Sequence, residues 1–389
     1  MYVIFFKFKM IKKILSFFLI SLLLVSCVAP TARLPDINSG QVKEQEERQK
    51  KLSYSNFTRE FQRTDNITFN INSSNQDICE KTDFDLGFKV SNSFAVGEKE
   101  APFYPTELNL GSQLSVVSVS KNSNAFKTGI LIGDKVNSIN NELLETGKNG
   151  LKDYQKKITK LKDQLVKIEI YRNGVKKNFE YTLNKVCGFP LVFTRDQIIN
   201  AFADGKNTYI TQGIAEYSRD DNELALVIGH ELAHNNRKHI EAKTTNAILG
   251  SIVGLTLDLL IIASGGYSNG EYTDMLSKIG AQAYSVEFEQ EADYAGLYYA
   301  KRAGYDISEA NEFWTRMGAK NPSSIAHNST HPATAARFVA LKSTVTEINN
   351  KIKNGEPLLP NEKKEYKKEG DKTTSQKKFD LKDIFKKKQ

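Results

Sequence analysis

Two histidines and a glutamate near the middle of the chain have the types and spacing of a catalytic metal site. The run Gly229–His234 reads Gly-His-Glu-Leu-Ala-His. Apolar residues recur around it at helical spacing, and Asp220 followed by Glu223 is typical of a helix start, so we expect one helix over Asp220–Ile240. Imidazoles four residues apart on a helix share a face and can bind one tetrahedral Zn²⁺. Glu231 could then take a proton from a water at the metal, which is the chemistry of peptide-bond hydrolysis.

A third metal ligand must come from elsewhere in the chain. The metzincin pattern requires Gly three residues and His six residues after His234, but this sequence has Arg237 and, one residue early, His239. That class is excluded. Glu289 and Asp293 are four residues apart on a second expected helix, a spacing that suits one ligand and one carboxylate that orients a histidine. An acidic, solvated helix face remains the alternative, as does a chance HExxH on an ordinary surface helix.

Three motifs in order resemble the gluzincin peptidase family of HtpX, the CaaX prenyl protease and the mitochondrial Oma-type protease, in particular its soluble bacterial envelope branch. They are the 229–234 run, the 289–293 run, and Thr330-His331-Pro332 with Arg337, and the likeness covers about residues 187–341. It implies a mostly helical zinc-peptidase domain with one Zn²⁺ per chain. By this resemblance the zinc ligands are His230, His234 and Glu289, the general base is Glu231, and the supporting carboxylate is Asp293.

His331 and Arg337 have less defined roles. In the family the matching His-Pro lies near the active site, and Pro332 should stiffen the loop that carries His331. A neutral His331 imidazole in the fourth position of the zinc would act as a gate, whereas a capping or substrate-binding His331 would not touch the metal. Arg337 could bind a substrate carbonyl or a carboxylate of the site.

The first 26 residues read as a targeting sequence. Lys12 and Lys13 precede an apolar stretch that closes with Leu-Val-Ser-Cys27. This resembles a bacterial lipobox, which implies cleavage and acylation at Cys27 and a stable membrane anchor. Val28 after the cysteine favours the outer membrane by analogy with enteric sorting rules. A plain secretory signal or transmembrane anchor is the alternative, and Met10 is a second candidate start.

The net charge of +8 is concentrated at the two ends of the chain. The stretch from Lys351 to Gln389 alone holds 13 Lys against 7 acidic residues. The remaining body is nearly neutral, so a nucleic-acid partner is not expected. Residues 27–84 should form a polar tether and a helix, and residues 349–389 a disordered Lys-rich tail.

Residues 85–186 have short β runs with Gly punctuation and resemble a PDZ domain. The resemblance rests on the stretch from Ala125 to Asn140, with Leu86-Gly87-Phe88 as a weaker candidate for the carboxylate-binding loop. Asn173-Gly174 predicts a tight hairpin, and Leu151–Leu165 an amphipathic helix. A PDZ groove between a strand and that helix would bind an extended peptide by strand addition. An unrelated small β domain is the alternative.

A cysteine pair and an apolar stretch give two further predictions. Cys79 and Cys187 bracket the PDZ-like region, which in an oxidising compartment favours a disulfide, with two unpaired thiols as the alternative. The stretch 247–263 is strongly apolar but contains Asp258, which favours a buried or membrane-leaning helical hairpin over a membrane span.

The sequence therefore predicts an α+β multidomain protein with a small β-rich PDZ-like domain followed by a mostly α-helical gluzincin domain at residues 187–348. The expected function is that of a lipid-anchored, periplasm-facing zinc endopeptidase of the bacterial envelope, acting on misfolded or misassembled proteins. A chaperone-like or scaffolding lipoprotein, and a regulatory protease with one native target, are the rival functions.

Overall fold

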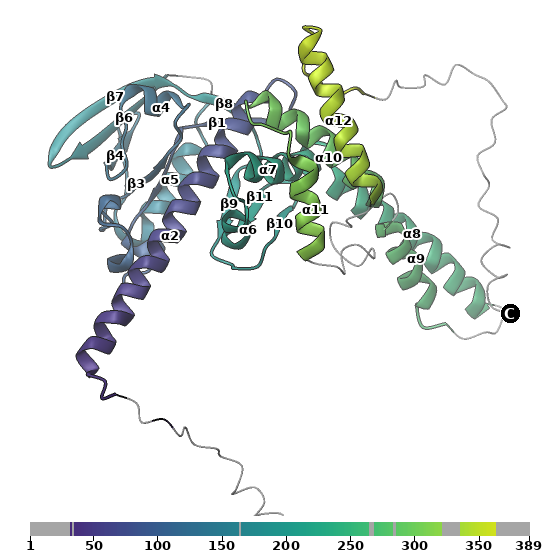
Figure 1. The fold of residues 1–389 in the computed structure, drawn as a ribbon, viewed down its shortest axis with the longest axis horizontal. Coiled ribbons are helices and arrows are strands. Elements are labelled where there is room, and N and C mark those ends of the chain that lie inside the picture. Colours follow the sequence, from purple (N-terminus) through teal and green to yellow (C-terminus); the bar gives the residue numbers. More distant parts are fainter. Residues whose placement is uncertain are drawn as a thin grey trace, which may run out of the picture. The chain divides into compact units, whose positions relative to one another are not determined.

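The computed structural model describes residues 32, 35–162, 165–263, 268–282, 285–320 and 335–362 (Figure 1). Two of the residues singled out in the sequence, Cys27 and His331, lie outside these ranges. The chain divides into two compact units, Met1–Lys50 and Lys51–Gln389.

A long helix, α2 (Ser39–Ser74), opens the described part of the chain. Buried residues begin at Thr58 in its second half, and Ile67 and Ile71 are completely buried in the same apolar core as the predicted active helix. This part was expected to be a tether and packing helix outside the peptidase domain. Its Thr- and Asn-rich sequence does not indicate this role, because several of its buried side chains are polar and hydrogen-bonded, such as Asn72, which donates to the Phe189 carbonyl at 3.2 Å.

The PDZ-like region is an antiparallel sheet in the order β2-β3-β4-β6-β7, with β5 paired to β4. Its core consists of the inward residues of each strand, such as Val166, Ile168 and Ile170. The strands are β2 (Phe88–Ser91), β3 (Ser115–Val119), β4 (Lys135–Ile139), β5 (Glu142–Leu143), β6 (Leu165–Arg172) and β7 (Val175–Thr182), and the short helices are α3 (Ser93–Val96), α4 (Asn124–Thr128) and α5 (Gly150–Ile158).

The hairpin between β6 and β7 turns at Asn173 and Gly174 as expected, with φ of 53° and 77°. Two positive φ values in succession are the geometry of a type I′ turn. The expected helix over Leu151–Leu165 is wrong at its C-terminal end, because α5 ends at Ile158 and Leu165 already pairs with Thr182 in the sheet. The apolar residues from Val166 onward alternate with period two, which is the pattern of a strand, and they belong to β6 rather than to the helix.

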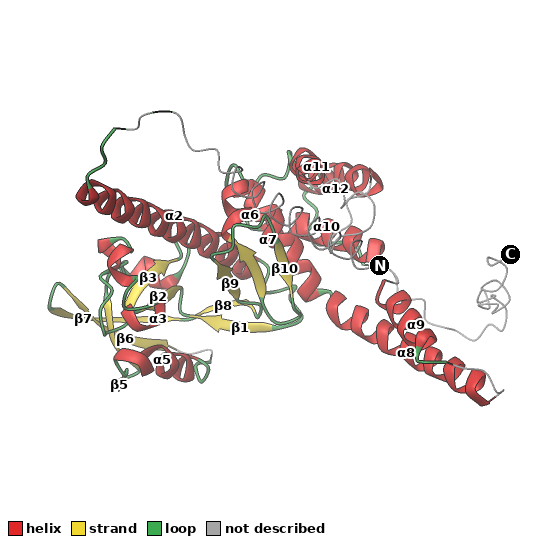
Figure 2. Ribbon diagram, turned by 90° about the horizontal axis from the view of Figure 1, so that it is seen from below, coloured by secondary structure: helices red, strands yellow, loops and turns green. Residues whose placement is uncertain are grey.

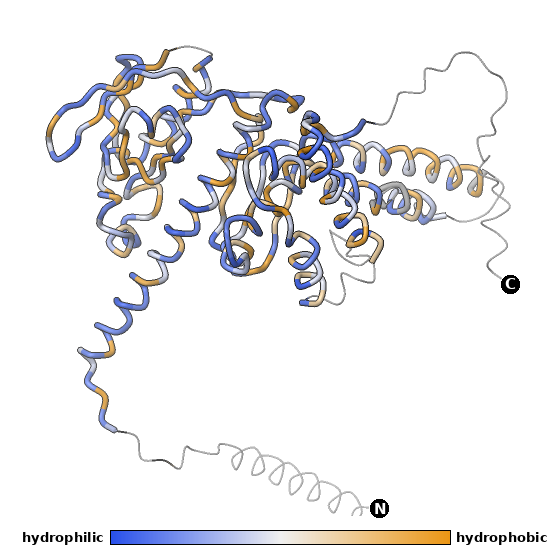
Figure 3. The backbone as a smooth tube through the Cα atoms, turned by 45° about the horizontal axis from the view of Figure 1, so that its top comes forward, coloured by the Kyte–Doolittle hydropathy of each residue, from blue (hydrophilic) through white to orange (hydrophobic). Residues whose placement is uncertain are grey.

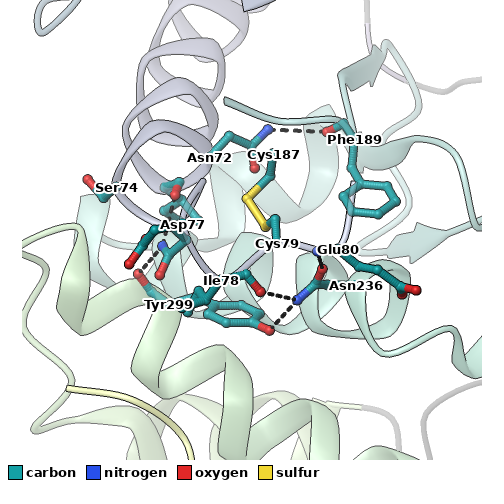
Figure 4. Close-up of a disulfide and its surroundings, with 12 residues drawn as sticks. Asn72, Ser74, Asp77, Ile78, Cys79, Glu80, Cys187, Phe189, Asn236 and Tyr299 are labelled. Carbon is teal, nitrogen blue, oxygen red and sulfur yellow. Dashed lines mark hydrogen bonds between the residues drawn. A yellow bond between two sulfur atoms is a disulfide. The ribbon is translucent and has the colours of Figure 1, made fainter. Parts of the chain in front are cut away.

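A two-stranded ribbon joins the PDZ-like region to the rest of the chain. Strand β1 (Thr82–Asp85) pairs antiparallel with β8 (Asn184–Cys187). Next to this ribbon, Cys79 and Cys187 form a disulfide with a Cα–Cα distance of 5.6 Å, as expected from the sequence (Figure 4). The PDZ-like region thus leaves and re-enters the molecule at one place.

The remaining chain consists of a small sheet and a set of helices. Strands β9 (Leu191–Thr194), β10 (Ala201–Ala203) and β11 (Thr208–Thr211) have the order β10-β11-β9, and Figure 2 shows them beside α6 and α7. The helices are α6 (Gln212–Tyr217), α7 (Asp221–Asn236), α8 (His239–Ala263), α9 (Glu271–Gln282), α10 (Ser285–Arg302), α11 (Ala310–Lys320) and α12 (Ala335–Lys353).

Two expected boundaries differ from the structure. The single helix expected over Asp220–Ile240 is two helices, because α7 ends at Asn236 and Lys238 has a φ of 56°. A residue in the left-handed region ends a helix and lets the next one, α8, start in a new direction. The peptidase region was expected to end at residue 348, but α12 continues to Lys353 with Ile348 fully buried.

Candidate active site

Helix α7 carries the HExxH motif and is buried on all sides. Its N-cap Asp220 accepts a hydrogen bond from the Glu223 amide at 2.9 Å, as the sequence suggested. The Glu223 carboxylate accepts two hydrogen bonds from the guanidinium of Arg316, at 3.0 and 2.6 Å. A helix that is apolar around its circumference belongs inside a core. The motif is therefore held in the rigid centre of the domain.

The close approach of α7 and α10 depends on two glycines. A Cβ atom at Gly229 would lie 2.6 Å from the carbonyl oxygen of Gly296, and one at Gly296 would lie 2.8 Å from the amide nitrogen of His230. The helix backbones therefore touch. This contact brings the His230 and Glu289 side chains from different helices within reach of each other.

Three buried ligand atoms converge between these helices. The Nε2 atoms of His230 and His234 are 3.1 Å apart, and each lies 3.3 Å from a carboxylate oxygen of Glu289. The three residues are 2%, 2% and 0% exposed. Tetrahedral zinc with bonds of about 2.0–2.1 Å separates its ligand atoms by roughly 3.4 Å. The donor types and their spacing fit one Zn²⁺, and the three residues are those expected as ligands.

The other ring nitrogen of His230 is held by a carboxylate. His230 Nδ1 lies 3.0 Å from Asp293, which accepts two hydrogen bonds from Arg337 at 2.7 and 2.8 Å. Arg337 also lies 3.3 Å from Glu289. Asp293 thus lies where a supporting carboxylate was expected. Two roles were considered for Arg337, and its contacts fit the second, which is binding carboxylates of the site.

These buried charges shift one another's pKa values. Burial favours a neutral His230, but Asp293 and Glu289 outweigh it and raise the pKa of this imidazole to about 9 in the metal-free protein. Burial raises the pKa of Asp293, but Arg337 and then His230 outweigh it, so that pKa is lowered. Only the neutral imidazole is a metal ligand, so metal binding and protonation of His230 oppose each other.

The residue that supports His234 was not predicted from the sequence. His239 Nδ1 lies 3.0 Å from His234 Nδ1, and its Nε2 lies 3.2 Å from Glu291. On one continuous helix His239 would point away from the ligands. The break at Lys238 returns it to the site, and the left-handed residue that allows this has no distinctive sequence signal.

The remaining candidates are placed as follows. Glu231 is 2% exposed on α7, beside the first ligand. Glu287, two residues before the third ligand, is exposed and outside the ligand set. The ring of Trp314 on α11 lies 5.2 Å from the His230 ring and forms an apolar wall of the site. His331 lies outside the described residues.

Comparisons with known proteins match both regions of the chain. Residues 176–345 match the family described as peptidase family M48, and residues 85–183 match the PDZ domain family. The "Mitochondrial metalloendopeptidase OMA1" of Schizosaccharomyces pombe is 29% identical over 166 residues, which is 40% of this chain and 47% of that protein. The "Beta-barrel assembly-enhancing protease" of Escherichia coli O157:H7 is 29% identical over 136 residues, 33% of this chain and 28% of that protein.

The chain thus spans less than half the length of these relatives. Among solved structures, a crystal structure of the HtrA3 PDZ domain bound to a phage-derived ligand matches 28% of this chain and 92% of that chain, with 17% identity and a TM-score of 0.22. The motif order, the buried His-His-Glu cluster and the two family matches together identify residues 176–345 as a zinc metallopeptidase domain similar to those of peptidase family M48, preceded by a PDZ domain.

Proposed function

We propose that this protein is a lipid-anchored zinc endopeptidase of the bacterial cell envelope. The observation that carries the proposal is the convergence of His230, His234 and Glu289, with ligand atoms 3.1–3.3 Å apart in a buried site. Three protein ligands leave a fourth position open, which is typical of catalytic rather than structural zinc.

The residues around the metal have separate tasks. When bound, Zn²⁺ lowers the pKa of a water and polarises the carbonyl of the peptide to be cleaved. Glu231 accepts the proton of the attacking water and passes it to the leaving amine. Asp293 accepts the Nδ1–H of His230 and His239 accepts that of His234, so both imidazoles keep the Nε2 lone pair directed at the metal.

The edge strand β10 is the place where we expect the substrate backbone to lie. It ends the order β10-β11-β9, so one side of it is not paired within the described sheet. Asn235, which follows the second ligand, accepts from the Gly205 amide at 2.9 Å and donates to the Asn207 carbonyl at 3.0 Å. These bonds tie the β10–β11 turn to α7. A peptide added to β10 would therefore have a fixed position relative to the ligands.

The PDZ domain is the candidate site for recruiting substrates. Strand β2 ends the order of its described sheet and can accept an extended peptide as a further strand. In the loop before it, the amide of Gly87 donates to Asp85 at 2.6 Å, and Lys89 pairs with the same carboxylate at 2.7 Å. The chain's own carboxylate thus occupies the loop that was expected to bind a C-terminal carboxylate.

The compartment and substrate class rest on separate observations. The Cys79–Cys187 disulfide favours an oxidising compartment, and the lipobox-like run ending at Cys27 favours an anchored protein, with the outer membrane preferred. One relative is named for enhancing β-barrel assembly. We infer that the substrates are misfolded or misassembled envelope proteins.

The decisive experiment compares a catalytic variant with ligand variants. Glu231→Gln should retain one Zn²⁺ per chain and lose turnover, whereas His230→Ala, His234→Ala and Glu289→Ala should each lose the metal. Metal analysis and a casein or peptide cleavage assay measure the two properties. Full zinc content in Glu289→Ala would refute the assignment of this ligand.

The same Glu231→Gln variant separates the rival functions. Proteins that it captures in cells, identified by mass spectrometry, should be several misassembled envelope proteins. One dominant captured protein would instead indicate a regulatory protease. Full rescue of the cellular phenotype by Glu231→Gln would indicate a chaperone or scaffold and contradict the proposed proteolytic role.

A further inference from the structure

The α8–α9 hairpin exposes a large apolar surface. Seven aliphatic side chains of α8 are each 52–61% exposed, and the described part of the hairpin exposes no aromatic residue. In Figure 3, one helix of the pair at the right is orange along much of its length. These residues are Ile248, Leu249, Ile252, Val253, Leu255, Leu259 and Leu260. We call this set the aliphatic face. A surface of this kind marks an interaction site.

Every polar side chain in the described apolar stretch of α8 is hydrogen-bonded within the hairpin. Asp258 is 3% exposed and accepts hydrogen bonds from the Ser268 hydroxyl and from the Thr273 amide and hydroxyl, the last two at 2.9 and 2.7 Å. Ser251 and Thr256 each donate to the carbonyl four residues earlier at 2.9 Å. An apolar medium requires the polar groups to be paired in this way.

The packing of α8 against α9 is also of a kind found in apolar surroundings. A Cβ atom at Gly250 would lie 2.0 Å from the Leu276 carbonyl oxygen, and one at Gly254 would lie 2.3 Å from that of Tyr272. The two backbones therefore touch along a small-xxx-small stripe. Such stripes are typical of helix pairs in lipid, where close packing replaces the hydrophobic effect.

The composition of the aliphatic face favours lipid over a protein partner. Protein–protein hot spots are enriched in Trp, Tyr and Arg, and this face consists of Ile, Leu and Val alone. Helix α8 is also long and apolar enough to cross a membrane: the candidate span is His239–Ile261, with a mean hydropathy of 1.5.

The partner helix excludes a full crossing. Helix α9 packs alongside α8, and it exposes Glu271, Asp274 and Lys278 on its outer side. Its 12 residues reach only about 18 Å, against a hydrocarbon core of about 30 Å. The hairpin therefore has one apolar and one charged side, as a helix that lies in the membrane interface does.

We propose that the aliphatic face of α8 docks into one leaflet of a lipid bilayer as a second membrane contact, independent of acylation at Cys27. The base of the hairpin is the zinc site, because α8 begins at His239 and α10, which follows α9, carries Glu289. Docking thus places the active site next to the bilayer surface, where it reaches membrane-associated substrates.

Site-specific fluorescence in the full-length, acylated chain tests the docking. Ile252→Cys and Leu259→Cys probe the aliphatic face, Asp274→Cys the charged side of the hairpin, and Val339→Cys another exposed apolar residue, 69% exposed on α12. Each is labelled with an environment-sensitive maleimide without reduction, so that the native disulfide stays closed. The chain without an added cysteine gives the background.

The labelled chains are reconstituted in vesicles of phosphatidylethanolamine and phosphatidylglycerol, with or without a spin label on the acyl chains. We expect a blue shift and loss of emission by spin-label quenching at positions 252 and 259, and neither at 274 or 339. Because all four chains share the anchor, proximity alone cannot produce this difference. Water-like emission at 252 and 259 would overturn the proposal. So would a blue shift that is not quenched and grows with the protein-to-lipid ratio, since it would indicate a second copy of the chain.

A cleavage assay tests the consequence, which rests on the proposed function. Combined Ile252→Asp and Leu259→Asp should slow cleavage of a vesicle-bound substrate and leave that of a soluble peptide unchanged, with Val339→Asp as the control. Equal cleavage of the vesicle-bound substrate by all variants would refute the role of docking. If the unmodified chain cleaves neither substrate, the proposed function fails, while the quenching result still decides the docking.

Discussion

Each imidazole of the zinc site has a hydrogen-bond partner on the ring nitrogen that faces away from the metal. For His234 that partner is His239, at 3.0 Å. Removing such a partner typically lowers metal affinity about 10- to 100-fold. We therefore expect His239→Ala to weaken zinc binding by this factor, as measured by competition with a chelator. His239→Asn keeps a polar atom near the Nδ1 position and should recover part of the affinity. Unchanged affinity in the alanine variant would exclude His239 from the site's support.

The second residue-scale prediction concerns Arg337, which is 3% exposed between two buried carboxylates. Removing one partner of a buried ion pair leaves an uncompensated charge and costs about 3–5 kcal/mol. We expect Arg337→Met to lower the free energy of unfolding by about this amount in urea titrations. Arg316→Met is the comparison variant, since 23% of the Arg316 side chain is exposed in its pair with Glu223 and its removal should cost less than that of Arg337. Equal losses in both variants would contradict the distinction.

At this scale the sequence was most informative about the ligands. Histidines at i and i+4 on an apolar helix must share a face, so His230 and His234 could be placed without a structure. His239 could not, because its position depends on a single left-handed residue, Lys238, which the local sequence does not reveal. Nor could the sequence place Trp314 beside His230, a contact that depends on how two distant helices pack.

Among the elements, the contact between α7 and α10 controls how closely the ligands approach. A methyl group at position 296 would lie 2.8 Å from the His230 amide, so the helices would have to move apart. Overpacking of this kind costs about 1–3 kcal/mol. Gly296→Ala should therefore lower the melting temperature and reduce zinc content, measured by calorimetry and metal analysis. Gly304→Ala controls for adding a methyl group, since its Cβ would meet no atom within 4 Å, although its positive φ adds some strain. Full zinc content in Gly296→Ala would show that the contact between α7 and α10 accommodates a methyl group without displacing the ligands.

The loop before β2 gives a prediction for the PDZ domain. Asp85 already accepts the Gly87 amide, so a free C-terminal carboxylate would meet a like charge there. We expect a substrate-derived peptide to bind equally well with a free or an amidated C-terminus, as measured by fluorescence anisotropy. A clear preference for the free carboxylate would mean that Asp85 moves aside on binding. Asp85→Ala should then increase that preference.

Local sequence signals predicted local elements better than they predicted how those elements pack together. The Asn173-Gly174 turn was predictable because both residues tolerate positive φ. The burial of α2 was not predictable, because Thr and Asn at core positions suggest an exposed surface until their hydrogen-bond partners are known. Gly229 preceded the motif on a buried run in the sequence, but only the structure shows that Gly296 is the residue it contacts.

For the molecule as a whole, the disulfide is the contact whose removal we expect to have the largest effect on folding. Cys79 and Cys187 are 108 residues apart in sequence. Opening a closed loop near that length costs about 4.7 kcal/mol through the entropy of the unfolded chain, less any strain in the native state. The combined Cys79→Ser and Cys187→Ser variant should lose a comparable free energy of unfolding in urea. A loss below about 1 kcal/mol would mean that the unfolded chain is already held together near this bridge.

The proposed acylation of Cys27 gives the last prediction. Cys27→Ala should abolish labelling with a radioactive or clickable fatty acid, and should leave an unprocessed or released protein. Fractionation of the unmodified chain should place it in the outer membrane. Recovery in the inner membrane alone would contradict that assignment without affecting acylation itself.

The antiparallel pair β1–β8 has an evolutionary consequence. Because the chain enters and leaves the PDZ domain side by side, that domain is an insertion that another domain of similar end spacing could replace. Residues before and after it, such as Ile71 and Ile210, share one core, so the host fold closes without it. Replacing the PDZ domain at this ribbon should therefore direct the enzyme to new substrates while the peptidase domain stays intact.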